Sequence, residues 1–171
     1  MINKFALLTG ALAGILFAAS LFISWQMGIN SLAAFHKLYA FLPAIFLIVL
    51  ASAWWMQQRQ GWQLEMKHII RFSFLSYIVF EAFYFFANYL LFDITDPSAY
   101  PRLVDTLNQQ DVAKLRAEGA PEDKIEETIK MGEYAKEALG FGQRMIGIGQ
   151  ALILDFIKSV IIGTIIKQFK R

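Results

Sequence analysis

Apolar residues are concentrated in four long runs along the chain. The runs cover about residues 5–25, 38–56, 72–92 and 145–166. Each run is about 20 residues long, which is enough for an α-helix to cross the hydrocarbon core of a bilayer. A chain of 171 residues has too little other sequence to cover four such helices in a water-soluble core. We therefore expect an all-α integral membrane protein, with four transmembrane helices in an antiparallel up-and-down bundle. The whole of residues 1–171 would form this one membrane domain in the lipid bilayer.

The first run has features of a signal peptide as well as of a membrane helix. It follows Lys4 and ends in small residues, in the segment MINKFALLTGALAGILFAAS. Its apolar stretch is longer than the 7–15 residues typical of signal peptides. We therefore expect a retained transmembrane helix.

Basic residues predict how the bundle is oriented. They lie before the first run, between the second and third runs, and after the fourth, and they are Lys4, Arg59, Lys67, Arg71, Lys167, Lys170 and Arg171. With four spans, these three segments fall on the same side of the membrane. Segments rich in Lys and Arg next to membrane helices remain in the cytoplasm. Both termini are therefore expected to be cytoplasmic.

The segment of about residues 93–143, between the third and fourth runs, is predicted to be an extracytoplasmic helical hairpin. It is acidic, with eleven Asp and Glu against six Lys and Arg. Pro101 and Pro121 suit the first turns of two helices, and Gly119 suits the end of the first one. The hairpin could lie on the membrane surface, fold over the bundle, or serve as a docking surface for a partner protein.

Two local features indicate how the spans pack and bend. Gly10, Gly14 and Ala18 form a ridge of small residues on the first span, which favours close packing of helices inside the bundle or, alternatively, a homodimer contact. Pro43 either kinks the second span or marks its first turn. The short segment of about residues 26–37 is expected to be an outer loop.

Three charged residues lie in the middle of the third and fourth runs. Asp155 and Lys158 are three residues apart, so they share one face of a helix. Glu81 lies near the centre of the third run, at the same expected depth as Asp155. An isolated charge at this depth costs about 2.5–3.5 kcal/mol. The sequence therefore predicts an intramembrane cluster in which Lys158 bridges Glu81 and Asp155.

A polar stripe supports the predicted cluster. The residues that share the face of Glu81 at helical spacing are Ser73, Tyr77, Tyr84 and Asn88. The fourth run has a matching stripe of small and polar residues, which are Gly147, Ala151, Asp155, Lys158 and Ser159. We expect these two stripes to face each other. The cluster could be a structural clasp, a proton or ion pathway with one protonated carboxyl, or a charge kept for another subunit.

Composition and motifs argue against several classes of protein. A net charge of +2 without a long basic run gives no support for nucleic-acid binding, and there are no cysteines. The sequence has no nucleotide-binding P-loop, no H-E-x-x-H zinc motif and no G-x-S-x-G nucleophile motif. We therefore predict no catalytic residues, no metal site, no cofactor and no enzymatic activity.

The order of these features resembles a known family. A basic segment, MQQRQGWQLEMKHIIRF, precedes an aromatic third run that contains Ala82 and Phe83. The acidic segment RAEGAPEDKIEETIKM has the form Gly-Ala-x-Glu-x-x-Ile-Glu. This arrangement, over nearly the whole chain, resembles the bacterial membrane family catalogued as domain of unknown function 4199. The resemblance implies a multi-pass protein of the bacterial inner (cytoplasmic) membrane and implies no activity.

Two functions are compatible with this sequence. The first is a non-enzymatic subunit or accessory protein whose outer hairpin contacts a partner protein. The second is a small proton- or ion-coupled transporter or channel that acts as a homo-oligomer through Glu81, Asp155 and Lys158.

Overall fold

In the part of the chain that the computed structural model describes, residues 2–137 and 141–169, all regular structure is helical. The elements are α1 (Ile2–Gln26), α2 (Ile29–Phe41), α3 (Ala44–Arg59), α4 (Met66–Tyr89), the π-helical turn η1 (Leu90–Thr95), α5 (Ala99–Ala117), α6 (Glu122–Glu137) and α7 (Phe141–Gln168). Lys170 and Arg171, two of the basic residues used to predict orientation, lie outside the described residues.

Three helical segments are long and apolar enough to cross a membrane. They are α1, α4 together with η1, and the Met145–Gln168 part of α7. A fourth crossing is formed if α2 and α3, which meet at an angle of 49°, act as one broken span. The chain is thus an α-helical, multi-pass membrane protein with three or four membrane-spanning segments.

The second predicted span is bent at Pro43, which is one of the two roles that the sequence left open for this residue. A single helix was expected over residues 38–56, but the chain leaves the helical conformation at Leu42, which has an extended backbone (φ −89°, ψ 118°). Pro43 explains the break, because its ring disfavours a helical conformation in the residue before it. The expected loop of residues 26–37 is also mostly helical, because α2 begins at Ile29.

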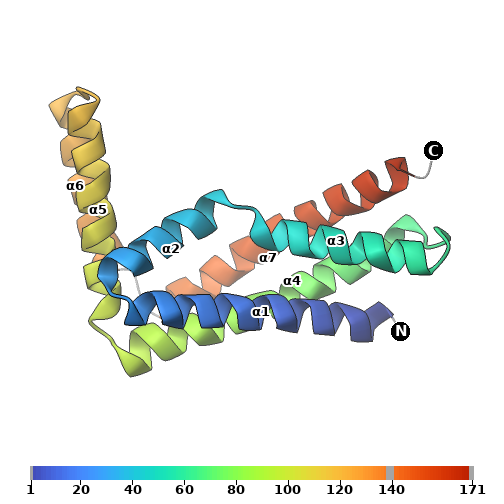
Figure 1. The fold of residues 1–171 in the computed structure, drawn as a ribbon. Helices are drawn as coiled ribbons and strands as arrows, with labels where there is room; N and C mark the ends of the chain where they lie inside the picture. The colour runs from blue at the N-terminus through green and yellow to red at the C-terminus, as the bar shows by residue number, and fades with distance from the viewer. Residues whose placement is uncertain (1, 138–140, 170–171) are drawn as a thin grey trace.

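Close contact between α1 and α4 forms the centre of the bundle (Figure 1). A Cβ atom added at Gly10 would overlap the Ser76 carbonyl oxygen, and one added at Gly14 would overlap the Phe83 side chain. The ridge of small residues on α1 is therefore a packing face inside the bundle, as the sequence predicted. On the other side of α4, α7 packs along the same helix.

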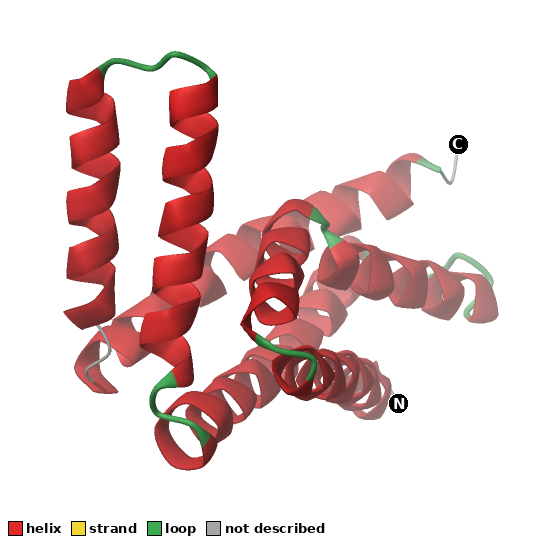
Figure 2. Cartoon of the chain, turned by 60° about the vertical axis from the view of Figure 1, so that its left-hand side comes forward, coloured by secondary structure: helices red, strands yellow, loops and turns green. Residues whose placement is uncertain are grey.

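The two ends of the bundle differ in structure. Both chain ends and the turn between α3 and α4 lie at one end (Figure 1). At the opposite end, α5 and α6 form a helical hairpin that runs across the bundle axis and extends beyond it (Figure 2). As predicted, the first hairpin helix stops at a glycine, since Gly119 has a positive φ of 68° after α5. The main contact between the hairpin and the rest of the bundle is that of α5 with α2.

Candidate functional site

The central charges are positioned by the antiparallel packing of α4 and α7. The rings of Phe74 and Phe156 meet edge to face with centroids 5.5 Å apart. About two turns further along α7, Gly163 is close to Ile70. These contacts fix the register of the two helices and bring Asp155 opposite the turn of α4 that contains Tyr77 and Glu81.

Asp155 and Lys158 form an ion pair on α7. Lys158 Nζ lies 2.9 Å from Asp155 Oδ1. The Asp155 side chain is only 1% exposed, whereas 46% of the Lys158 side chain is exposed. Nζ also lies 5.5 Å from the centre of the Tyr77 ring. Asp155 therefore points into the protein, and Lys158 reaches it from the edge of the α4–α7 contact.

Glu81 approaches the same aspartate from α4. Its carboxyl lies within hydrogen-bonding reach of Asp155, whereas no ion pair joins it to Lys158 among the described residues. Asp155 Oδ2 is buried and accepts no hydrogen bond from an N–H or a hydroxyl group. Two ionised carboxylates repel each other, so a hydrogen bond between Glu81 and Asp155 requires a proton on one of them. The arrangement differs from the predicted bridge, in which Lys158 contacts both carboxylates. Lys158 contacts Asp155, and Glu81 approaches Asp155 from α4.

The predicted polar stripe divides into two parts. Toward the end with the chain termini, the Ser73 and Tyr77 hydroxyls are buried without a hydrogen-bond partner among the described residues. Toward the hairpin end, Asn88 donates to the backbone oxygen of Tyr84 at 2.7 Å. On α7, the Ser159 hydroxyl donates to the backbone oxygen of Asp155, also at 2.7 Å. Asn88 and Ser159 thus bond to the backbone of their own helices, whereas the hydroxyls of Ser73 and Tyr77, two turns and one turn before Glu81 on α4, have no partner among the described residues.

A cavity of about 590 Å³ opens on the hairpin side of Glu81, between α2, α4, α5 and α7. Its walls are mostly aromatic and apolar, and Glu81 is the one carboxylate among its described lining residues. The lining residues are His36, Tyr39, Glu81, Tyr84, Phe85, Asn88, Phe92, Tyr100, Leu103, Val104, Leu107, Gly147, Ile148 and Ala151. The cavity connects the middle of the bundle to the base of the hairpin.

Phe17 of α1 holds two of the cavity's aromatic side chains in place. Its ring centroid lies 5.0 Å from that of Tyr39 and 4.9 Å from that of Tyr84. Tyr39 and Tyr84 in turn stack at 6.0 Å. His36 is fixed at the cavity by a 3.0 Å hydrogen bond between Nδ1 and the backbone oxygen of Leu32. The wall is therefore preorganised by side chains from three helices.

Sequence reasoning found Glu81, Tyr84 and Asn88 but not the cavity that they line. Helical spacing identifies residues on one face of one helix, and these three share such a face. The residues from α2 and α5, such as Tyr39 and Tyr100, have no spacing relation to Glu81. Gly147 and Ala151 were placed on the small-residue stripe of the fourth span, and the structure places them beside the cavity.

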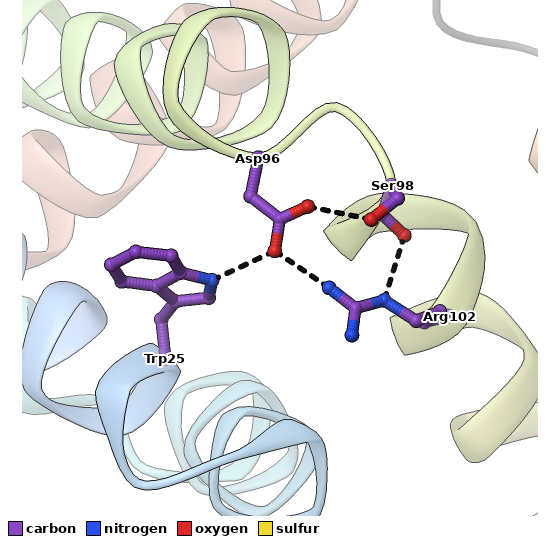
Figure 3. Close-up of polar contacts among 4 residues, drawn as sticks. All are labelled: Trp25, Asp96, Ser98 and Arg102. Carbon is purple, nitrogen blue, oxygen red and sulfur yellow. Dashed lines mark hydrogen bonds and ion pairs between the residues drawn. The ribbon is translucent and has the colours of Figure 1, made fainter.

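A second cluster of polar residues joins the hairpin to α1 at the base of α5 (Figure 3). Asp96 accepts hydrogen bonds from Ser98 Oγ at 2.6 Å, from Trp25 Nε1 at 3.1 Å and from the Arg102 guanidinium at 2.6 Å. The hydrogen bonds from Ser98 and Trp25, together with the charge of Arg102, hold the pKa of Asp96 below its ordinary value. Lys37 of α2 adds an ion pair to Asp111 of α5 at 3.1 Å. These contacts anchor the helix that forms the outer wall of the cavity.

The comparisons with known proteins identify a family without an assigned activity. No curated protein and no solved structure matches the chain. The match to a protein family covers residues 4–168, which is nearly the whole chain. The chain therefore belongs to the family described as "Protein of unknown function (DUF4199)".

Proposed function

We propose that this protein is a proton-linked membrane carrier in which Glu81 binds and releases the proton. The observation that carries the proposal is the position of the Glu81 carboxyl, which borders an open cavity and also lies within hydrogen-bonding reach of the buried Asp155. Ionisable residues inside membrane spans that face a cavity commonly take part in proton or substrate movement.

The pairing of charges favours Glu81 as the group that exchanges the proton. Lys158 already neutralises Asp155, so the cluster with both carboxylates ionised has one excess negative charge. A proton on Glu81 removes this charge and provides the donor that Asp155 Oδ2 lacks. Glu81 is therefore stable in mid-membrane when protonated, and it needs another cation when it is not.

The unpaired hydroxyls of Tyr77 and Ser73 support a route for the proton toward the opposite end. They lie one and two helical turns from Glu81 on the same face of α4 and are buried. Buried polar groups without protein partners are commonly satisfied by water. For a proton to pass along these hydroxyls, water would have to enter the closed side of the bundle, near Ser73 and Tyr77, while the cavity on the other side of Glu81 closes. This alternation is the alternating access of a carrier.

We expect the carrier to act as an oligomer in the bacterial inner membrane, with both termini in the cytoplasm. The orientation is supported by Arg59, the last residue of α3, and Lys67, in the first turn of α4, because the connection between these helices lies at the same end of the bundle as the chain termini. An oligomer is supported by the exposed part of Lys158, which a neighbouring subunit would cover. Single cysteines at Asp111 and Gln58 should react with a membrane-impermeant thiol reagent from opposite sides, and reaction from one side would contradict this topology.

Proton movement through Glu81 can be measured in proteoliposomes. With a membrane potential imposed and a pH indicator inside the vesicles, the wild type should acidify or alkalinise the lumen according to the sign of the potential. Glu81→Gln should abolish this flux, because the amide does not exchange a proton. Glu118→Gln is the matched control, since it neutralises an exposed carboxylate outside the cavity. Equal flux in wild type and Glu81→Gln would refute the proposal.

A second candidate function rests on the outer face of α6, whose main contact in the chain is α5. Met131 and Tyr134 are 65% and 72% exposed. They line a shallow hollow of about 410 Å³ with Asp123, Glu126, Glu127 and Lys130. An apolar patch with an acidic rim is complementary to a basic amphipathic helix. This face would then dock such a helix of a partner protein, and the chain would be an accessory subunit.

The docking hypothesis predicts a stoichiometric complex in mild detergent. A partner with a basic amphipathic helix should copurify from native membranes with the wild type and with Glu118→Gln. It should be lost from the Met131→Glu, Tyr134→Glu double variant. Recovery of only this chain, as monomer or homo-oligomer, would contradict docking and leave the carrier as the better proposal.

A further inference from the structure

We infer that the cavity beside Glu81 binds a monovalent organic cation with an apolar or aromatic body, in competition with the proton. This inference rests on the proposed function, since it names the substrate class of the same site. It depends on three properties of the cavity, namely its charge, its aromatic walls and its size.

The charge of the cavity is negative, and the described residues that line it include no Lys or Arg. Among the described lining residues, Glu81 is the one that carries a full charge at neutral pH, apart from the titratable His36. Lys158 does not line the cavity and is bound to Asp155 at 2.9 Å. An ionised Glu81 in mid-membrane therefore has no cationic partner on the cavity side among the side chains that the structure describes. A cationic ligand would supply that charge, whereas an anion would be repelled.

The aromatic walls favour a diffuse organic cation over a small inorganic one. Tyr39 and Tyr84 stack at 6.0 Å, and Phe92 meets Tyr100 edge to face at 5.6 Å. The faces of such rings attract ammonium groups, and aromatic cages commonly recognise quaternary ammonium ligands. Among the described residues, no three His, Asp or Glu side chains gather to hold a metal ion. The oxygen ligands that a small hard cation requires are accordingly scarce here.

The size of the cavity leaves room for an apolar body attached to the cation. A volume of about 590 Å³ lies within the range of sites that bind drug-sized molecules. Leu103, Val104 and Leu107 of α5 add an apolar wall. A ligand with its charged group at Glu81 would therefore place its body against α5, at the base of the hairpin.

Binding exchanges one cation for one proton. In the empty site, the proton of Glu81 is shared with Asp155. When the cation enters, the O–H bond of Glu81 breaks, the proton leaves to the solvent in the cavity, and an ion pair forms between the carboxylate and the ligand. The net charge of the site is the same before and after. One proton should be released per cation bound, and the affinity should rise with pH until Glu81 is fully ionised.

The test uses benzyltrimethylammonium and its neutral isostere neopentylbenzene, in which carbon replaces the ammonium nitrogen. Calorimetric titration of the purified full chain in nonionic detergent, in two buffers of different ionisation enthalpy, measures both affinity and proton release. The wild type should bind the cation at one site at least about tenfold more tightly than the isostere. Glu81→Gln should lose this preference and the proton release.

Two variants at Tyr84 test the aromatic wall without changing the charge. Tyr84→Leu should weaken binding of the cation about tenfold, and Tyr84→Phe should preserve it, since a phenyl ring keeps the attractive face. Thermal unfolding of each variant shows whether it is folded. Glu118→Gln, which neutralises an exposed carboxylate outside the cavity, should bind as the wild type does.

The outcomes separate this inference from the proposed function. Equal affinity for the two probes, or no binding of the cation by the folded wild type, would overturn the inference. If proton flux through Glu81 persists in that case, the proposed function stands without it. If the cation binds with proton release but the proteoliposomes show no flux, the inference stands and the protein binds cations without carrying them.

Discussion

Asp96 and Asp155 are both paired with a basic side chain, but only Asp96 has both carboxylate oxygens hydrogen-bonded. Its Oδ1 accepts from Ser98, and its Oδ2 accepts from Trp25 and Arg102. Asp155 Oδ1 accepts from Lys158, whereas its buried Oδ2 has no hydrogen-bond partner among the described residues. The two clusters also differ in place, since the Asp96 cluster lies beyond the apolar spans and the Asp155 cluster lies in the middle of them.

In the proposed function, the Asp96 cluster is a structural anchor and the Asp155 cluster is a site of proton exchange. A carboxylate with fixed donors on both oxygens gains nothing from a proton, so the Asp96 cluster is suited to holding α5 against α1. A buried oxygen without a fixed donor is costly unless a mobile proton satisfies it. The second cluster is therefore suited to taking up and releasing a proton, and it is the one that borders a cavity.

The largest effect is expected from removing both carboxylates of the inner cluster. The Glu81→Gln, Asp155→Asn double variant leaves Lys158 without an anionic partner in mid-membrane. We expect a loss of about 3 kcal/mol in the free energy of unfolding, the cost of one unpaired charge at this depth. Unfolding by denaturant or heat in nonionic detergent measures it.

The control for this double variant is the triple variant with Lys158→Met, which removes the stranded amine. The free energy of unfolding should then return close to that of the wild type, because we attribute the instability of the double variant to the unpaired charge of Lys158 and not to a lost contact. If the triple variant is as unstable as the double variant, the carboxylates do not stabilise the protein by neutralising Lys158.

A smaller effect is expected at the outer cluster, where Asp96→Asn should cost about 1 kcal/mol at neutral pH, because the group is partly exposed and its ion pair is screened. The folded pKa of Asp96 lies below the ordinary value of 3.8. Its stabilising contribution is therefore complete above the unfolded pKa and is lost as the pH falls through the lower folded pKa. Unfolding curves between pH 5 and the acid limit should fall more steeply for the wild type than for Asp96→Asn. Parallel curves would show that Asp96 does not act as an ionised anchor.

The sequence predicted those parts of this comparison that depend on one helix at a time. The spacing of Asp155 and Lys158 on one helix face predicted their contact, and the small residues Gly10 and Gly14 predicted the close approach of α1 and α4. The helical hairpin between the last two spans was also predicted, with its first helix ending before Gly119. Each of these features follows from local geometry.

The features that the sequence did not predict depend on how helices are placed in space. A kink at Pro43 was among the expectations, but the direction in which it places α2 was not, and α2 supplies Tyr39 and His36 to the cavity. The base of α5 supplies Tyr100, and its position depends on the hydrogen bonds of Asp96. No periodicity links these segments to Glu81, so the cavity could be found only from the structure.

The smallest effect on stability is expected from Tyr77→Phe, which removes the unpaired hydroxyl next to Glu81 and keeps the ring beside Lys158. A buried hydroxyl without a partner gains nothing from burial, so its loss should leave the unfolding midpoint unchanged or slightly higher. Trp25→Phe is the comparison at the outer cluster, since it removes a hydrogen bond to Asp96 and should cost up to about 1 kcal/mol.

The same Tyr77→Phe variant should slow proton flux in proteoliposomes, because the hydroxyl lies on the polar face between Glu81 and the end of the bundle that contains the chain termini. A loss of stability larger than that of Trp25→Phe would mean that water or another donor already bonds the Tyr77 hydroxyl in the resting protein. The closed side of the bundle would then contain water in the resting protein. Opening of the cavity alone would then have to control proton movement through Glu81.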